Sequence, residues 1–136
     1  MQSIRIKSFI SRVKNKFDKA EKKATTMACI HVTNEAKKKL SHKGTGRLYT
    51  SREGKGDHRA SAEGEPPASD TGQLRRTVGY DVKTNISGYV GRVGTPEKYG
   101  LELERGTSRI APRPWLKPTE KETRKEVRKI FIRELR

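Results

Sequence analysis

Apolar and charged positions alternate with a helical period over the first forty residues. Residues 3–41 contain neither Gly nor Pro. Apolar side chains recur there at spacings of three and four, which aligns them along one side of a helix: Ile6, Ile10, Val13, Phe17, Ala20, Ala24 and Met27. We predict an N-terminal helix over residues 1–41, about 55 Å long, as one helix or as two in tandem divided near the β-branched pair Thr25–Thr26. Its stripe is expected to be mostly structural core and partly subunit interface.

The helical pattern stops after residue 41. Residues 42–68 are rich in Gly, Ser and charged side chains, with some strand character over residues 47–50. Connections of this length are usually functional arms or disordered segments. We expect residues 42–68 to form a flexible arm that becomes ordered against a neighbouring subunit. A surface loop without a function is the alternative.

A hairpin is predicted in the middle of the chain. Ser69 or Asp70 can cap a short helix that precedes it. Apolar and polar residues alternate over 78–82, turn-forming residues occupy 85–88, and residues 89–93 return as a second strand. This order is typical of two antiparallel strands joined by a tight turn.

Prolines and glycines delimit the elements that follow the hairpin. Thr95 and Pro96 are expected to begin a short helix over 96–105, and Gly106 is expected to end it. The proline-containing segment 107–114 should be extended and could add a third strand to the sheet.

A final helix is expected to begin near Pro118. Thr119 and Glu122 match a capping box, in which a hydroxyl and a carboxylate bind first-turn amides. The sequence therefore predicts one α+β domain, in which a long N-terminal helix and a C-terminal helix pack on a small antiparallel sheet. The domain is expected to span residues 1–136. Its segments are the N-terminal helix (1–41), the arm (42–68), a helix–hairpin–helix core (69–118) and the C-terminal helix (119–136).

The composition favours a component of an assembly. Hydrophobic residues make up 30% of the 136 residues, so the chain can build a thin core that leaves apolar surface for other subunits to cover. The net charge is +16, and residues 1–43 carry twelve Lys or Arg against three acidic residues. Such an excess is compatible with nucleic acid or other anionic partners.

Candidate catalytic and metal-binding residues are few and poorly spaced. Cys29 has no partner for a disulfide and fits a small buried hydrophobe. His31, His42 and His58 lack the spacing that places two imidazoles on one metal ion. No stretch approaches the roughly 20 apolar residues of a membrane span. We expect no catalytic, metal or cofactor site and no membrane association.

Two blocks of sequence resemble one family. One reads Gly-Glu-Pro-Pro-Ala-Ser-Asp-Thr-Gly-Gln-Leu-Arg-Arg-Thr over residues 64–77. The other reads Leu-Glu-Arg-Gly-Thr-Ser-Arg-Ile-Ala-Pro-Arg-Pro-Trp-Leu-Lys-Pro over residues 103–118. Together they resemble the HK97 gp10-like family of phage tail completion and neck (head-tail joining) proteins. Arg105 departs from the aromatic residue usual in the family before Gly-Thr-Ser.

The resemblance implies a structural function in the virion of a tailed phage, after assembly in the host cytoplasm. Copies of the chain, six being the expected number, would form a ring at the head–tail junction. The expected neighbours are the head connector or stopper and the tail terminator or tail tube, with nonspecific contact to genomic DNA. A basic, sequence-nonspecific nucleic-acid-binding protein is the alternative, although aromatic side chains for stacking are scarce.

Nine residues in or next to the two blocks are candidates for the assembly surface. The candidates for core or interface anchors are Leu101, Leu103, Ile110, Trp115 and Leu116. The candidates for polar contacts between subunits are Arg75, Arg76, Arg109 and Arg113. For each arginine, a solvated surface cation is the alternative.

Overall fold

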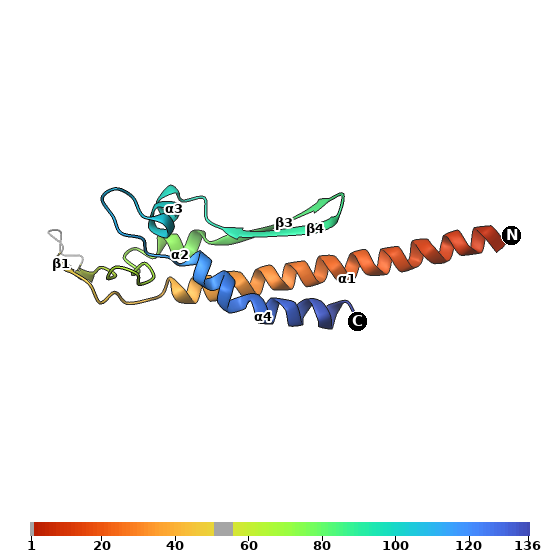
Figure 1. Cartoon of the computed structure of the whole chain (residues 1–136), viewed down its shortest axis with the longest axis horizontal. Coiled ribbons are helices and arrows are strands. Elements are labelled where there is room, and N and C mark those ends of the chain that lie inside the picture. Colours follow the sequence, from red (N-terminus) through yellow and green to blue (C-terminus); the bar gives the residue numbers. More distant parts are fainter. Residues whose placement is uncertain (1, 51–55) are drawn as a thin grey trace.

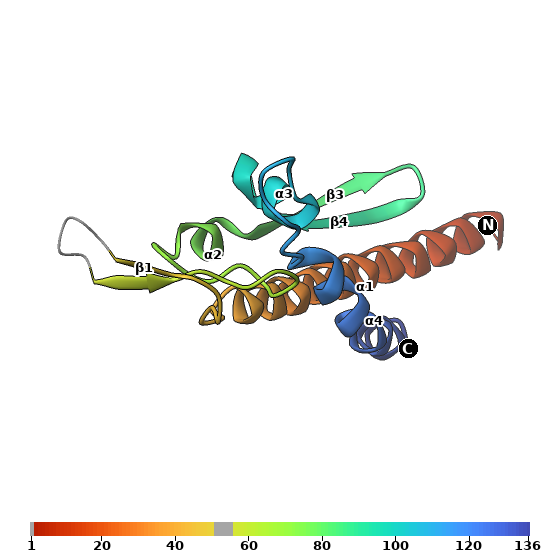
Figure 2. The same ribbon diagram turned by 60° about the vertical axis from the view of Figure 1, so that its left-hand side comes forward.

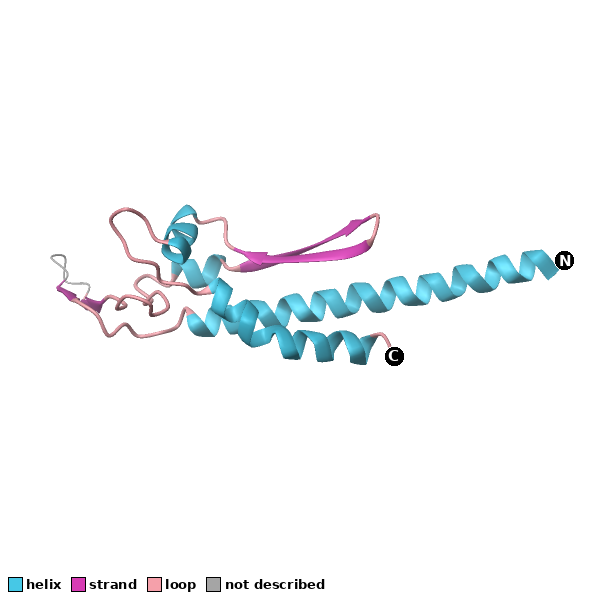
Figure 3. Ribbon diagram, in the orientation of Figure 1, coloured by secondary structure: helices cyan, strands magenta, loops and turns pink. Residues whose placement is uncertain are grey.

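The computed structural model describes residues 2–50 and 56–136, with side chains from residue 12 onward. It confirms the α+β class, with helices packed on small antiparallel sheets (Figure 3). The elements are, in order, α1 (Gln2–Lys39), β1 (Leu48–Thr50), β2 (Asp57–Arg59), α2 (Gln73–Thr77), β3 (Gly79–Asn85), β4 (Gly88–Gly94), α3 (Lys98–Arg105) and α4 (Leu116–Glu134).

Helix α1 lies along the long axis of the molecule (Figure 1). It is continuous over 38 residues, so of the two predicted forms the single helix is the one observed. The helix continues through Thr25 and Thr26, whose hydroxyls donate to the carbonyls of Glu21 and Lys22, at 2.9 and 2.8 Å, and are thereby satisfied within the helix. The β3–β4 hairpin lies along one side of α1 and α4 along another, while the N-terminal part of α1 projects beyond both (Figures 1 and 2).

The predicted hairpin is confirmed. Strands β3 and β4 pair antiparallel from Gly79 opposite Gly94 to Asn85 opposite Gly88, which leaves a two-residue loop. The Asn85 side-chain oxygen accepts the Ser87 amide at 2.8 Å, and Gly88 has a φ of 128° that favours glycine. The tip of the hairpin is fixed to α1, where the Glu21 carboxylate accepts the Tyr89 amide at 3.3 Å.

The suggestion of a third strand over 107–114 is wrong. This segment is a loop, and β3 and β4 pair with each other in a two-stranded sheet. Its backbone bonds go elsewhere: the Arg113 amide donates to the Leu103 carbonyl and the Thr107 amide to the Ile110 carbonyl. Pro112 and Pro114 also lack the amide hydrogen that a paired strand needs.

The arm contains a second small sheet. Strands β1 and β2 pair antiparallel, with Leu48 opposite Arg59. The chain before β1 runs against the chain after β2 so closely that a Cβ on Gly44 would lie 2.1 Å from the Ala60 carbonyl oxygen. Glycine is therefore required there for close backbone approach. Residues 51–55, the middle of the arm predicted to be flexible, lie outside the described residues.

Two of the predicted helix starts are wrong. Helix α2 is preceded by Gly72, with a φ of 73°, so neither Ser69 nor Asp70 caps it. Helix α3 begins at Lys98 because the Thr95 hydroxyl accepts the Glu97 amide, at 3.2 Å, in a turn ahead of the helix. The predicted end of α3 is confirmed by Gly106, whose φ is 75° and whose amide donates to the Glu102 carbonyl.

The start predicted for the last helix also needs correction. Helix α4 begins at Leu116 and has no capping box. The Thr119 hydroxyl donates to the Trp115 carbonyl at 2.6 Å, and the Glu122 carboxylate binds the Lys39 ammonium at 2.8 Å. Both side chains are therefore engaged with groups other than first-turn amides.

The core is thin, as the composition indicates. Among the described residues, those with buried apolar side chains are Ala24, Ala28, Ala36, Cys29, Leu40, Leu74, Val78, Trp115 and Ile130. The accessible surface is 10539 Å². A compact monomer of this mass exposes about 7,200 Å². The chain therefore exposes far more surface than its size requires.

Candidate assembly surface

Trp115 lies where the helices and the hairpin meet. Its side chain is 2% exposed and packs in a cluster with Ala36 of α1, Leu40 just after α1, Leu74 of α2 and Val78 before β3. The indole N–H donates to the Gly100 carbonyl in α3 at 3.0 Å. The structure thus places this predicted anchor in the core of the protomer. Leu103 and Leu116 are partly buried against the same cluster.

The Glu104 carboxylate joins α3 to the start of α4. One oxygen accepts the amides of Trp115 and Leu116, at 2.7 and 2.8 Å, and the other accepts the Lys117 amide at 2.9 Å. The next residue, Pro118, has no amide hydrogen, so Glu104 satisfies every free donor of the first turn. The helix dipole adds to this stabilisation of a negative charge. Glu104 could not be recognised as a cap from the sequence, because a capping partner eleven residues upstream has no local pattern.

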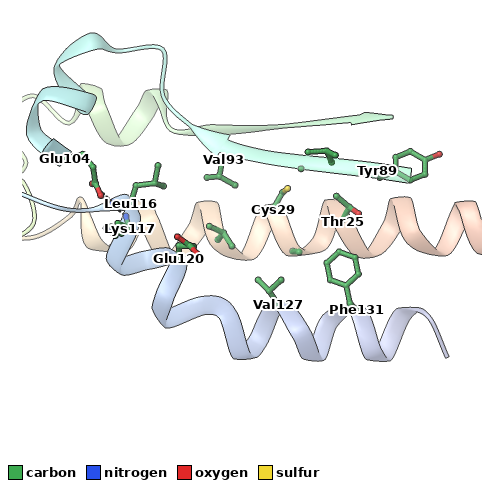
Figure 4. A pocket seen from close by; sticks show the side chains of 14 residues that line it. Thr25, Cys29, Tyr89, Val93, Glu104, Leu116, Lys117, Glu120, Val127 and Phe131 are labelled. Atoms are coloured by element: carbon green, nitrogen blue, oxygen red, sulfur yellow. Dashed lines mark hydrogen bonds between the residues drawn. The ribbon is translucent and has the colours of Figure 1, made fainter. Parts of the chain in front are cut away.

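An apolar groove runs between α1, β4 and α4 (Figure 4). Its volume is about 650 Å³. Val32 of α1, Val93 of β4 and Val127 and Phe131 of α4 contribute apolar walls, and Glu104 lies at the end nearest α3 (Figure 4). Such a volume accommodates several large apolar side chains.

The wall of the groove formed by the hairpin lies very close to α1. A Cβ on Gly91 would lie 2.2 Å from the Cys29 sulfur and 3.1 Å from the Thr25 methyl carbon. Burial, with a smaller contribution from Asp81, raises the pKa of the Cys29 thiol. Cys29 is therefore a neutral packing residue and not a reactive thiolate.

Large apolar side chains outside the core are exposed on the same molecule. Val13 and Phe17 of α1 are 51% and 54% exposed on the part of the helix that projects beyond the hairpin (Figure 1). Two predicted anchors, Leu101 and Ile110, are also exposed. The structure does not bring these two together with Trp115 in the core.

The four predicted arginines have different environments. Arg113 is fixed within the chain, because its guanidinium donates twice to the Ser61 carbonyl, at 3.3 and 3.2 Å. Arg75 is exposed and donates to the Ser41 hydroxyl at 3.0 Å. Arg76 and Arg109 are exposed. Arg113 thus holds the arm against the loop before α4.

Glu65 organises the base of the arm. Its carboxylate accepts the Thr45 hydroxyl, the Ala62 amide at 2.8 Å and the Thr45 amide at 3.2 Å, and it lies 3.3 Å from His42. These hydrogen bonds, that of the Thr45 hydroxyl foremost, lower the pKa of Glu65 to about 2. Because the pKa is depressed in the folded state, the stabilisation is present above about pH 4.5 and is lost as the pH falls towards 2.

We expect the base of the arm to loosen in acid. Amide exchange at Thr45 and Ala62, measured by NMR, should lose protection between about pH 4.5 and 2, and the Glu65 carboxyl should titrate near 2. The Glu65→Gln variant should lack this step, since glutamine does not titrate. A Glu65 carboxyl that titrates near 4.3, the ordinary value, would contradict the geometry.

In the part of the chain that the structure describes, no three His, Cys, Asp or Glu side chains are placed to hold a metal ion. No described helix is both long and apolar enough to span a membrane.

No protein-family model, curated protein or solved structure matches the chain.

Proposed function

We propose that the chain is a structural protein that assembles with copies of itself into a ring, and that the ring joins head and tail in a tailed phage. The observation that carries the proposal is the large surface that the protomer leaves uncovered, which includes apolar side chains such as Val13 and Phe17. The protein exposes 10539 Å², about 3,300 Å² more than a compact monomer of its mass. Permanent interfaces bury about 2,000–5,000 Å² in total, half on each partner, so a neighbour on each side of the protomer, as in a ring, can account for an excess of this size.

The position of the apolar surface favours a heterologous contact. The groove between α1, β4 and α4 is concave, whereas the projecting part of α1 carries Val13 and Phe17 on a convex helix surface. In the proposed assembly, this part of α1 from one copy occupies the groove of the next. An interface between two different patches closes into a ring when the rotation permits.

The place of the ring in the particle rests on the resemblance of residues 64–77 and 103–118 to tail completion and neck proteins. The proposed neighbours are the head connector or stopper and the tail terminator or tail tube. The proposed function is assembly, without a catalytic step. The arm is proposed to become ordered against a neighbouring copy. The free chain can be monomeric if the arm needs that neighbour.

The experiment is to locate the chain in the particle. Cryo-electron microscopy of phage particles that contain it should show a closed ring at the head–tail junction, with six copies expected. Sedimentation of the purified chain over a range of concentrations tests self-association independently. Single copies of the chain, or its absence from the junction, would contradict the proposed function.

A variant of the projecting helix tests the contact itself. Phe17→Asp places a charge in the proposed interface, so we expect loss of self-association and unjoined heads and tails, with the circular dichroism spectrum unchanged. Ile86→Asp, at the exposed tip of the hairpin, is the matched control and should assemble normally. Normal joining by the Phe17→Asp variant would show that α1 does not occupy the groove.

A further inference from the structure

We propose that the solvent-facing side of α1 binds the phosphate backbone of double-stranded DNA without reading its sequence. The first observation is a row of cations that begins on the projecting part of the helix. Arg12, Lys16, Lys19 and Lys23 follow each other at spacings of four, three and four. At 3.6 residues per turn, these four side chains lie within about 60° of the helix circumference.

This row is opposite the side of α1 that packs. The buried Thr25 and Ala28 are about 180° from the centre of the row at the same helical pitch. All four cations are exposed. Within the described residues, Lys23 pairs with Glu134 at 2.7 Å, whereas Arg12, Lys16 and Lys19 form no ion pair. These three charges are therefore available to an anionic partner.

A second cluster of cations lies in a surface hollow at the other end of α1. The hollow has a volume of about 640 Å³ and is lined by Lys37 and Lys38 of α1 and by Arg75 and Arg76 of α2, with His31 at its edge.

The acidic residue of this hollow is neutralised. Glu35 pairs with Lys38 at 2.5 Å, and this hydrogen bond is the main reason why the pKa of Glu35 is lowered. A concave site with this excess of guanidinium and ammonium groups suits phosphate oxygens.

The two clusters have a spacing that fits duplex DNA. Lys37 lies on the same side of α1 as Arg12, because 25 residues turn the helix through nearly seven whole turns. The axial distance between them is about 37 Å, close to the 34–36 Å of one turn of B-form DNA. Helix α1 lying along a duplex would thus meet phosphates at both ends of one helical turn.

Other anionic partners fit this face less well. Single-stranded nucleic acid is bound largely by aromatic stacking, and no Phe, Tyr or Trp belongs to the row or to the hollow. Insertion into an anionic membrane needs apolar residues beside the cations. Val13 and Phe17 supply them near the row, but the hollow has none. We therefore assign the whole face to DNA and treat vesicle binding as an outcome of the test.

The test compares two charge-reversal variants of the full chain. One is Arg12→Glu/Lys16→Glu/Lys19→Glu on the row. Its control is Lys121→Glu/Lys125→Glu/Arg128→Glu on α4, at the same spacing of four and three, with exposed side chains and an equal change of net charge. Fluorescence anisotropy with a labelled 30-base-pair duplex of arbitrary sequence measures affinity from 50 to 200 mM salt. Circular dichroism checks that both variants fold.

We expect the unchanged chain to bind duplexes of different sequence alike and to lose about 10³-fold in affinity over this salt range. The row variant should bind tenfold or more weakly, with a salt slope lowered by about three. The α4 variant should lose only a few-fold. A Lys37→Ala/Arg75→Ala/Arg76→Ala variant should weaken binding without removing it.

Three results would overturn the proposal. One is equal loss of affinity in the row and α4 variants, which would make bulk charge the cause. Another is binding that does not depend on salt. The third is absence of duplex binding by the unchanged chain, with or without binding to vesicles that contain phosphatidylserine. The proposed DNA-binding face depends only on α1 and α2 of one protomer. A failure of self-association in sedimentation would therefore leave it standing, and a failure of DNA binding would leave the proposed ring standing.

Discussion

The Trp115→Ala variant is expected to lose about 3–5 kcal/mol of unfolding free energy. The indole is 2% exposed and contacts residues from α1, α2 and the start of β3, while its N–H binds α3. Its removal leaves a cavity at the point where these elements meet. Domains of this size are commonly stable by 5–15 kcal/mol, so the variant should unfold at far lower urea or fail to fold. Urea unfolding followed by circular dichroism measures the loss.

Two further variants make the result specific. Trp115→Phe keeps most of the apolar contact and loses the hydrogen bond to the Gly100 carbonyl, so it should cost about 1–2 kcal/mol. Tyr80→Ala removes an aromatic side chain that is 45% exposed. Apart from the loss of its cross-strand contact, this substitution should lower the unfolding free energy by well under 1 kcal/mol. In particles, Trp115→Ala should leave heads and tails unjoined. A stable, normally joining Trp115→Ala protein would show that the residue is not the centre of the core.

The elements that the sequence predicts well are those with a regular period. The spacing of three and four over residues 3–41 and the alternation over 78–82 reflect which side of each backbone is covered. Both predictions correspond to observed elements, α1 and the β3–β4 hairpin. The class of the fold depends on these two, and it could therefore be predicted without tertiary information.

The helix starts were predicted less well, because residues distant in sequence decide them. Ser69, Asp70 and Thr119 are good capping residues by type. In the structure, however, a glycine precedes α2, and a carboxylate from α3 binds the first turn of α4. Local preference is worth about 1 kcal/mol, which a tertiary contact with three hydrogen bonds exceeds.

Some candidate residues could be recognised from the sequence, and others could not. The size of Trp115 and the prolines around it mark this residue as an anchor, and it is buried in the structure. Leu101 and Ile110 have the same apolar character but lie on exposed surface, and no feature of the sequence distinguishes them from Leu103. The row of cations on α1 could be found from spacing alone, whereas the hollow near Arg75 requires α2 to lie against α1.

The Glu104→Ala variant is expected to lose about 2–3 kcal/mol of unfolding free energy. The substitution leaves the amides of Trp115, Leu116 and Lys117 without their acceptor in a partly buried site. It also removes a negative charge from the positive end of the α4 dipole. Because the groove is walled by both α3 and α4 residues near Glu104, the start of α4 should fray and the groove should widen at that end. Urea unfolding measures the loss of stability, and amide exchange at residues 115–117 measures the fraying of the first turn.

A matched pair of variants separates capping from general loss of charge. Glu104→Gln keeps one carbonyl oxygen for the amides and should cost about half as much as alanine, since it accepts fewer and weaker hydrogen bonds. Glu102→Ala removes an exposed carboxylate from the same helix two residues away and should change stability by less than about 0.5 kcal/mol. If Glu104→Ala were no worse than Glu102→Ala, the start of α4 would be held by its packing around Trp115 alone, and the cap would contribute no measurable stability.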